Sequence, residues 1–211
     1  MMRIGGGSAN RRALRTVPGR AVRPTSGQVR QALFNMLREL VQNAIFVDLF
    51  AGTGSVGLEA LSHGAREVYF VEHDRCALMT LQANISRCNM VGRTTIVAAP
   101  LPRALRQLPV TLQADMLFLD PPYASDLAEV TLAALAECRI LAAHGVLIWQ
   151  HMARRAIPQT LLDRPLWKSR RYGNTQLSLY AALPTPPAMD GYEGRGARST
   201  SQRLSQQAQV R

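Results

Sequence analysis

The sequence is poor in the residues that build disulfide scaffolds, metal sites and membrane spans. Its 211 residues include three cysteines, Cys76, Cys88 and Cys138, with no CxxC pair and no Cys/His ligand spacing. This disfavours a disulfide framework and a structural zinc site. No apolar run approaches the roughly 18 residues of a membrane-spanning helix, and Met1–Gly6 lacks the apolar region of a secretory signal. We therefore expect a cytoplasmic protein without a metal, whose cysteines are small core residues.

Lysine is nearly absent from the whole chain, and acidic residues are absent from its first thirty positions. Lys168 is the sole lysine, and residues 1–30 hold seven arginines and no acid, or +7 of the formal net charge of +11. Residues 31–183 and 184–211 contribute +2 each. An acid-free basic segment is typical of proteins that bind nucleic acid. GC-rich codon usage would explain Arg over Lys but not the missing acids, and a transit peptide is a further alternative.

The body of the chain alternates short apolar runs with helical periodicities. The apolar runs predict strands at 45–50, 67–71, 94–98, 116–119 and 146–149. The helical periodicities lie at 26–41, 55–63, 75–89, 101–108 and 125–138. Continuously apolar strands separated by helices indicate a parallel sheet covered on both faces.

The C-terminal part of the body changes pattern. Residues 167–172 and 175–181 alternate around Gly173-Asn174, which predicts an antiparallel hairpin at one edge of the sheet. The segment from Pro184 is rich in Pro, Gly, Ser and Gln and is expected to be disordered. The predicted organisation is a basic extension (1–25), one α/β domain with a seven-stranded, doubly wound, mostly parallel sheet (26–183) and a tail (184–211).

A glycine-rich turn follows the first predicted strand, in the run from Asp48 through Phe50, Gly52, Thr53 and Gly54. Glycines at a strand-to-helix turn allow a tight bend and close approach of a ligand to the backbone. The spacing also fits a dinucleotide fingerprint, but an acid inside the strand and the short remaining chain argue against that. The pattern Asp-x-Phe-x-Gly-x-Gly is similar to motif I of S-adenosylmethionine-dependent methyltransferases. A purely structural turn is the alternative.

Two further acidic positions end predicted strands. Glu72 ends the second strand 20 residues after Gly52, a spacing at which a carboxylate can accept both hydroxyls of a ribose. His73 follows it and could contact the same ligand, and Asp74 could cap the next helix. Asp120-Pro121-Pro122-Tyr123 follows the apolar run 116–119.

Asp-Pro-Pro-Tyr suits chemistry on the exocyclic amine of a base. The lone pair of such an amine is delocalised into the ring, and acceptors around the NH₂ favour a geometry in which it can attack. Asp120 and the Pro121 carbonyl would supply these acceptors, because prolines fix φ and remove donors. Tyr123 offers a face on which a flipped base can stack.

Residues 2–182 resemble the bacterial 16S rRNA guanine-N2 methyltransferase (RsmD) family. The resemblance rests on Asp-Pro-Pro-Tyr, on Met2–Gly6, on Arg23-Pro24-Thr25 with Val29–Asn35, and on Arg171–Thr175. It implies a class I methyltransferase fold. It also implies S-adenosyl-L-methionine as cofactor, with the methionine part on Asp48 and the loop amides.

The resemblance further implies the reaction and the partner. Methyl transfer would go to the N2 of one guanine of 16S rRNA, the family's guanine 966 site, in a 30S subunit that is assembled or assembling. The protein would act as a monomer, without a membrane or a covalent intermediate. RNA contacts would fall to Arg11, Arg12, Arg15, Arg23 and Thr25.

The sequence departs from the family at two places, and it leaves other functions open. Ser26, Gly27 and Gln28 replace the family's acid and Arg, and Ala98–Pro102 lacks the usual polar contact to the adenine ring. The alternatives are an adenine-N6 methyltransferase on DNA or RNA and a cofactor-binding RNA assembly factor with little turnover. A nicotinamide oxidoreductase is a more distant possibility.

Overall fold

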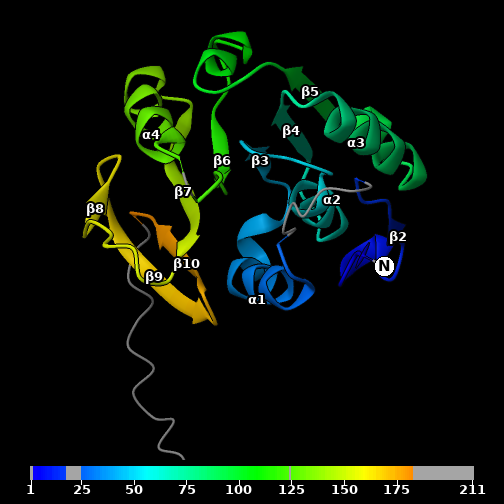
Figure 1. Ribbon diagram of the computed structural model, residues 1–211, viewed down its shortest axis with the longest axis horizontal. Helices are drawn as coiled ribbons and strands as arrows, with labels where there is room; N and C mark the ends of the chain where they lie inside the picture. Colours follow the sequence, from blue (N-terminus) through cyan, green and yellow to red (C-terminus); the bar gives the residue numbers. More distant parts are fainter. Residues whose placement is uncertain (1, 18–24, 124, 183–211) are drawn as a thin grey trace, which may run out of the picture.

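The computed structural model describes residues 2–17, 25–123 and 125–182 of the chain. Its centre is a sheet whose eight described strands have the order β5-β4-β3-β6-β7-β10-β9-β8 (Figure 1). Strands β5, β4, β3, β6 and β7 are parallel, and β10, β9 and β8 are antiparallel additions. The strands are β3 (Ile45–Asp48), β4 (Glu67–Glu72), β5 (Thr94–Ala98), β6 (Ala114–Leu119), β7 (Leu141–Met152), β8 (Thr160–Leu161), β9 (Arg164–Tyr172) and β10 (Thr175–Tyr180).

The predicted doubly wound, mostly parallel sheet with an antiparallel C-terminal hairpin is confirmed, and β8 adds an eighth strand to the seven expected. Strands β8 and β9 pair around a two-residue turn. Leu162 and Asp163 form that turn with φ of 50° and 59°. Such positive values are usually supplied by Gly or Asn, so the sequence carried no hairpin signal at this place.

Helices cover both faces of the sheet (Figure 1). The α-helices are α1 (Gly27–Leu37), α2 (Ser55–Ser62), α3 (Arg75–Arg87) and α4 (Leu127–Cys138). The 3-10 helices are η1 (Gly7–Ala9), η2 (Arg38–Val41), η3 (Val91–Arg93) and η4 (Arg103–Gln107). Apolar side chains of α1, α2 and α3 pack with Phe46, Phe70 and Phe118, whereas those of η4 and α4 pack with Val47 and Leu117 on the opposite face.

Three predicted elements differ most from the observed ones, and the strand expected at 45–50 ends already at Asp48. The helix expected at 26–41 is α-helical only to Leu37, because Arg38 takes a φ of 26° and the chain continues as a 3-10 helix. The helix expected at 101–108 is the short η4, which prolines at 100, 102 and 109 confine because proline lacks a donor and restricts its neighbour. The strand expected at 146–149 extends over Leu141–Met152, which brings Gln150 into the sheet.

The described part of the basic N-terminal extension is packed against the body. Strands β1 (Met2–Arg3) and β2 (Ala13–Leu14) pair antiparallel, and η1 between them contacts α2. Ile4, Ala9 and Leu14 are buried in the same core cluster as α1 and α2. The first residues of the extension are therefore part of the fold. The boundary at residue 25 stays a prediction, and the predicted disordered tail lies outside the described residues.

The cysteines differ in their burial. Cys88 is buried, but Cys76 and Cys138 are exposed, so the expectation of core cysteines is wrong for two of the three. Helices in the part of the chain that the structure describes are too short or too polar to cross a bilayer.

Candidate active site

Three polar side chains lie side by side on one face of the sheet, where the parallel strands β3, β6 and β7 end. Asp48 follows Phe46 by two residues, Asp120 follows Phe118 by two, and Gln150 follows Ile148 by two. Phe118 pairs with Asp48 on one side and with Ile148 on the other. Alternate residues of a strand share a face. The face that carries the apolar side chains of Phe46, Phe118 and Ile148 therefore carries the three polar side chains at its carboxyl edge. This edge is where open α/β sheets bind ligands.

Asp48 is buried, with 1% of its surface exposed. The Gly57 amide at the start of α2 donates to its Oδ2 at 3.1 Å, and its Oδ1 is buried without a hydrogen-bond partner among the described residues. Burial raises the pKa of Asp48 to about 7; the Gly57 amide and, to a smaller extent, the Phe50 amide oppose the shift, and the nearby carboxylates of Asp120 and Glu72 add to it. A positively charged ligand group would therefore relieve both the unpaired oxygen and the local excess of negative charge.

The two motif I glycines have different structural roles. Gly54, with φ of 80°, has no room for a side chain, since an added Cβ would lie 2.3 Å from Leu81 Cδ1. Gly52, with φ of 53°, has open space where its Cβ would be. The open side at Gly52 leaves the loop backbone accessible to a ligand. Phe50, also predicted at this loop, is half-buried.

Glu72 lies at the end of β4 and joins the glycine loop to the next helix. Its Oε2 accepts from the Gly52 amide at 2.8 Å, and its Oε1 accepts from the amides of His73 and Asp74 at 2.7 Å each. A carboxylate has about four acceptor sites, so capacity remains for a ribose hydroxyl. The His73 side chain is exposed, with Nδ1 3.6 Å from Glu72 Oε1. Asp74 caps α3 by accepting from the Ala77 amide, which confirms the predicted cap.

Asp120 follows β6 and receives two hydrogen bonds on one oxygen. Thr25 Oγ1 donates to Oδ2 at 3.1 Å, and Gln150 Nε2 donates to the same atom at 2.8 Å. Burial raises the pKa of Asp120 to about 7, against the lowering effect of these two donors. The carboxyl group is thus oriented, and its pKa is close to neutrality.

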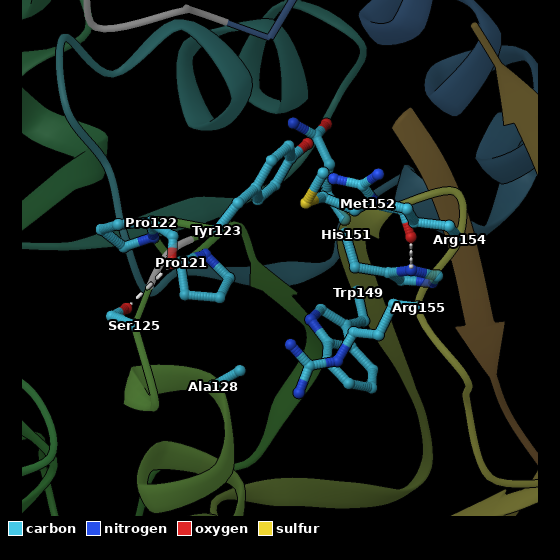
Figure 2. Close-up of a pocket in the computed structure, with 11 residues that line it drawn as sticks. Pro121, Pro122, Tyr123, Ser125, Ala128, Trp149, His151, Met152, Arg154 and Arg155 are labelled. Atoms are coloured by element: carbon cyan, nitrogen blue, oxygen red, sulfur yellow. Dashed lines mark hydrogen bonds between the residues drawn. The ribbon is translucent and has the colours of Figure 1, made fainter. Parts of the chain in front are cut away.

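Pro121, Pro122 and Tyr123 border a cavity of about 170 Å³ (Figure 2), and Gln150, which donates to Asp120, also lines it. The Tyr123 hydroxyl lies 3.3 Å from Thr175 Oγ1 on β10, a contact that orients the ring. The far side of the cavity is lined by residues of β7 and the loop after it. There the Arg155 guanidinium lies 4.9 Å from the centre of the Trp149 ring.

The predicted RNA contacts occupy different surroundings. Arg11, Arg12 and Arg15 have exposed side chains, although Arg12 Nη1 also donates to the Arg87 carbonyl at 2.6 Å. Thr25 is 7% exposed and contacts Asp120, so the structure places it in the Asp120 cluster. Arg23 lies outside the described residues.

Sequence reasoning missed two side chains that connect these parts. Gln150 was beyond the end of its predicted strand. Asn84 lies inside α3, fully buried, where its Oδ1 accepts from the Arg15 amide at 2.7 Å and its Nδ2 donates to the carbonyls of Arg15 and Thr53. It joins the N-terminal segment to the glycine loop. A polar residue between apolar helix positions was its only sequence signal.

These residues fit S-adenosylmethionine. The unpaired Asp48 Oδ1 and the surrounding carboxylates suit its positively charged ammonium and sulfonium groups, and Glu72 suits its ribose. No group of three or more His, Cys, Asp or Glu side chains in the described ranges has a metal-binding arrangement.

Sheet order and site together define a class I methyltransferase fold. The chain belongs to the RsmD family: the family model described as "Conserved hypothetical protein 95" matches residues 2–181. The Bacillus subtilis protein YlbH is 30% identical over 180 residues, which cover 85% of this chain and 98% of that protein. Ribosomal RNA small subunit methyltransferase D of Escherichia coli K12 is 29% identical over 179 residues, or 85% and 89% of the two chains. A solved structure from Thermus thermophilus has 34% identity and a TM-score of 0.71, with 85% and 98% of the two chains covered.

Cofactor affinity is expected to fall as the pH is lowered from 7 to 5.5. The pKa of Asp48 is raised to about 7 by burial, so below that pH a proton must leave before the carboxylate can pair with the ligand's ammonium group. The Kd for S-adenosylmethionine should then rise toward tenfold per pH unit. Isothermal titration of the cofactor into the protein at several pH values measures this slope.

The matched variants Asp48→Asn and Asp120→Asn identify the group responsible. Asp48→Asn should bind weakly with a nearly flat pH dependence over this range. Asp120→Asn removes a charge that raises the pKa of Asp48, so it should keep the slope but move it to lower pH. An unchanged slope in Asp48→Asn would assign the proton to another group.

Proposed function

We propose that this protein transfers a methyl group from S-adenosylmethionine to the exocyclic N2 of one guanine in 16S rRNA, the family's guanine 966 site. The observation that carries the proposal is the arrangement at Asp120: two donors orient its carboxylate, and one of them, Gln150, also lines the cavity at Tyr123. The name of the Escherichia coli relative supports rRNA as the substrate.

The chain's own residues would act on the base rather than on the methyl group. Asp120 Oδ1 and the Pro121 carbonyl accept from the two N2 hydrogens, which directs the nitrogen lone pair at the methyl carbon, and Tyr123 stacks on the ring. S-adenosylmethionine supplies an activated methyl group, and S-adenosylhomocysteine is the leaving group. The N–C bond forms as the S–C bond breaks. The surplus N2 proton then passes to Asp120, whose pKa of about 7 suits a general base near neutral pH.

The test is methylation of small ribosomal subunits from a strain that lacks the modification, using cofactor with a tritiated methyl group. Nucleoside analysis should yield N2-methylguanosine, and each protein molecule should complete many turnovers. N6-methyladenosine would favour the adenine alternative. Binding of cofactor and RNA with less than one turnover would favour an assembly factor. Either result contradicts the proposal.

Replacing the exposed arginines of the N-terminal extension is expected to weaken RNA binding without changing the chemical step. Arg11, Arg12 and Arg15 are exposed on the N-terminal segment, where they would contact phosphates. The triple change to Gln should raise the KM for the subunit and reduce the slope of log KM against log salt by about one per lost phosphate contact. Steady-state kinetics between low and moderate salt measure both quantities.

A matched triple variant controls for net charge alone. Arg66, Arg93 and Arg139 are equally exposed, but they precede β4, β5 and β7 and so lie at the amino edge, opposite the site. Their replacement by Gln should leave the salt slope near that of the wild type. Equal effects of the two triple variants would show that the N-terminal extension makes no specific contribution to RNA binding.

A further inference from the structure

Gln150 interrupts an apolar face of the sheet. Val146 and Ile148 precede it on β7 and belong to the core cluster under α1, and Leu177 is its partner on β10. The alternation on this face predicts another aliphatic side chain at position 150, because alternate positions of a strand have the same surroundings. Gln150 is instead polar, with only 4% of its surface exposed.

The surroundings of Gln150 satisfy only half of its amide group. Its Nε2 donates to Asp120 Oδ2 at 2.8 Å, while its Oε1 is buried and has no partner in the described part of the chain. A buried acceptor left unpaired destabilises the folded state. Stability alone would therefore favour Met or Leu here. Gln150 lines the cavity at Tyr123, and its one hydrogen bond there, to Asp120, points to a role at Asp120.

Thr25, which lies far before Asp120 in the sequence, contacts the same oxygen. Its hydroxyl donates to Asp120 Oδ2 at 3.1 Å, and its own carbonyl accepts from Arg30 Nη1 of α1 at 2.9 Å. Two donors from separate elements thus converge on one oxygen of a buried carboxyl group. Neither contacts Oδ1, so the pair fixes which oxygen remains for the substrate amine.

We infer that Gln150 and Thr25 are positioning residues: they hold Asp120 Oδ2 so that Oδ1 accepts from the N2 amine. The inference rests on the proposed function. Both donors also favour the ionised carboxylate, so they lower the pKa of Asp120, which burial raises. Without either donor, Asp120 is less well oriented and is protonated at a higher pH, although the base and the cofactor still bind.

The test compares kcat, KM and pH profiles of Gln150→Met, Thr25→Val and Thr25→Ser. Gln150→Met and Thr25→Val should each lower kcat by about tenfold to a hundredfold, the effect expected for losing a hydrogen bond to a charged group, with little change in the KM for RNA. The acidic limb of the kcat profile should move to higher pH in both. Thr25→Ser, which retains the donor, should resemble the wild type. Gln113→Met, at an exposed position directly before β6, is the matched control and should leave kcat and the pH profile unchanged.

Two further measurements separate positioning from a structural role. In the Asp120→Ala background, Gln150→Met should have no additional effect on kcat, because its target is gone. Denaturant unfolding at pH 6, where Asp120 is mainly protonated, should show Gln150→Met to be as stable as the wild type or more so. A less stable Gln150→Met with an unshifted pH profile would overturn the inference. If Gln150→Met does not fold, the comparison of kcat and the pH profile between Thr25→Val and Thr25→Ser tests the inference instead.

Failure of this inference differs from failure of the proposed function. If the wild-type protein produces no N2-methylguanosine, the proposed function fails. If it does, and both donor-lacking variants keep the wild-type kcat and pH limb, only the positioning role is lost.

Discussion

Asp120→Asn is expected to lower kcat for rRNA methylation by about 10²–10³-fold, as much as Asp120→Ala, although Asn has nearly the shape of Asp. The magnitude is that of losing one preorganised hydrogen-bonding group in an active site. Thr25 and Gln150 both donate to the Oδ2 position, so they select the amide oxygen of Asn for that position. The amide NH₂ then faces the substrate amine, where a donor meets a donor.

Single-turnover transfer of labelled methyl groups to subunits measures this effect on the chemical step. The Kd for the cofactor should change little in both variants, because Asp120 is not one of its predicted ligands. Asp163→Asn, in the exposed turn between β8 and β9, serves as a matched control and should keep the wild-type rate. An Asp120→Asn enzyme within about tenfold of the wild type, or 1.4 kcal/mol in the barrier, would contradict the acceptor role of Oδ1.

The sheet and the acidic site residues were predictable because their signals are local. Apolar runs between helical periodicities predicted β3, β4, β5 and β6, and the ends of two of these runs located Glu72 and Asp120. Asp48 was expected inside the strand 45–50, whereas β3 ends at Asp48. Gln150 was missed because the predicted strand stopped where the apolar run stopped. A polar residue two positions beyond a buried strand residue shares its face, so the alternation rule would have placed Gln150 next to Asp120 had the strand been extended.

The N-terminal segment shows what composition cannot predict. Its arginines were counted together as a polyanion-binding charge, but Ile4, Ala9 and Leu14 pack it into the core, and Asn84 and Glu59 bind its backbone. These contacts join residues that are more than fifty positions apart, so no local pattern specifies them. Thr25 was assigned to RNA by its neighbours in the sequence, whereas its hydroxyl contacts a carboxylate 95 residues away.

Breaking the buried Arg30–Glu59 ion pair is expected to lower the free energy of unfolding by about 3–5 kcal/mol. The two residues are 2% and 1% exposed, with Arg30 Nε 2.8 Å from Glu59 Oε2. Arg30 also donates to the carbonyls of Thr25 and Arg3, and Glu59 Oε1 accepts from the Gly5 amide. Arg30→Met or Glu59→Met leaves one buried charge without its partner and several backbone groups without theirs.

Denaturant unfolding of the two single variants and of the double variant measures the coupling. The double variant should be more stable than the sum of the single changes predicts, because it buries no unpaired charge. The exposed pair Arg66 and Glu67, 3.6 Å apart, is the control, and its removal should change stability by about 0–1 kcal/mol. Additive effects at Arg30 and Glu59 would show that the pair is not coupled. Coupling would mean that Arg30 is neutralised inside the fold, so that its charge belongs to the core and is not available to a phosphate.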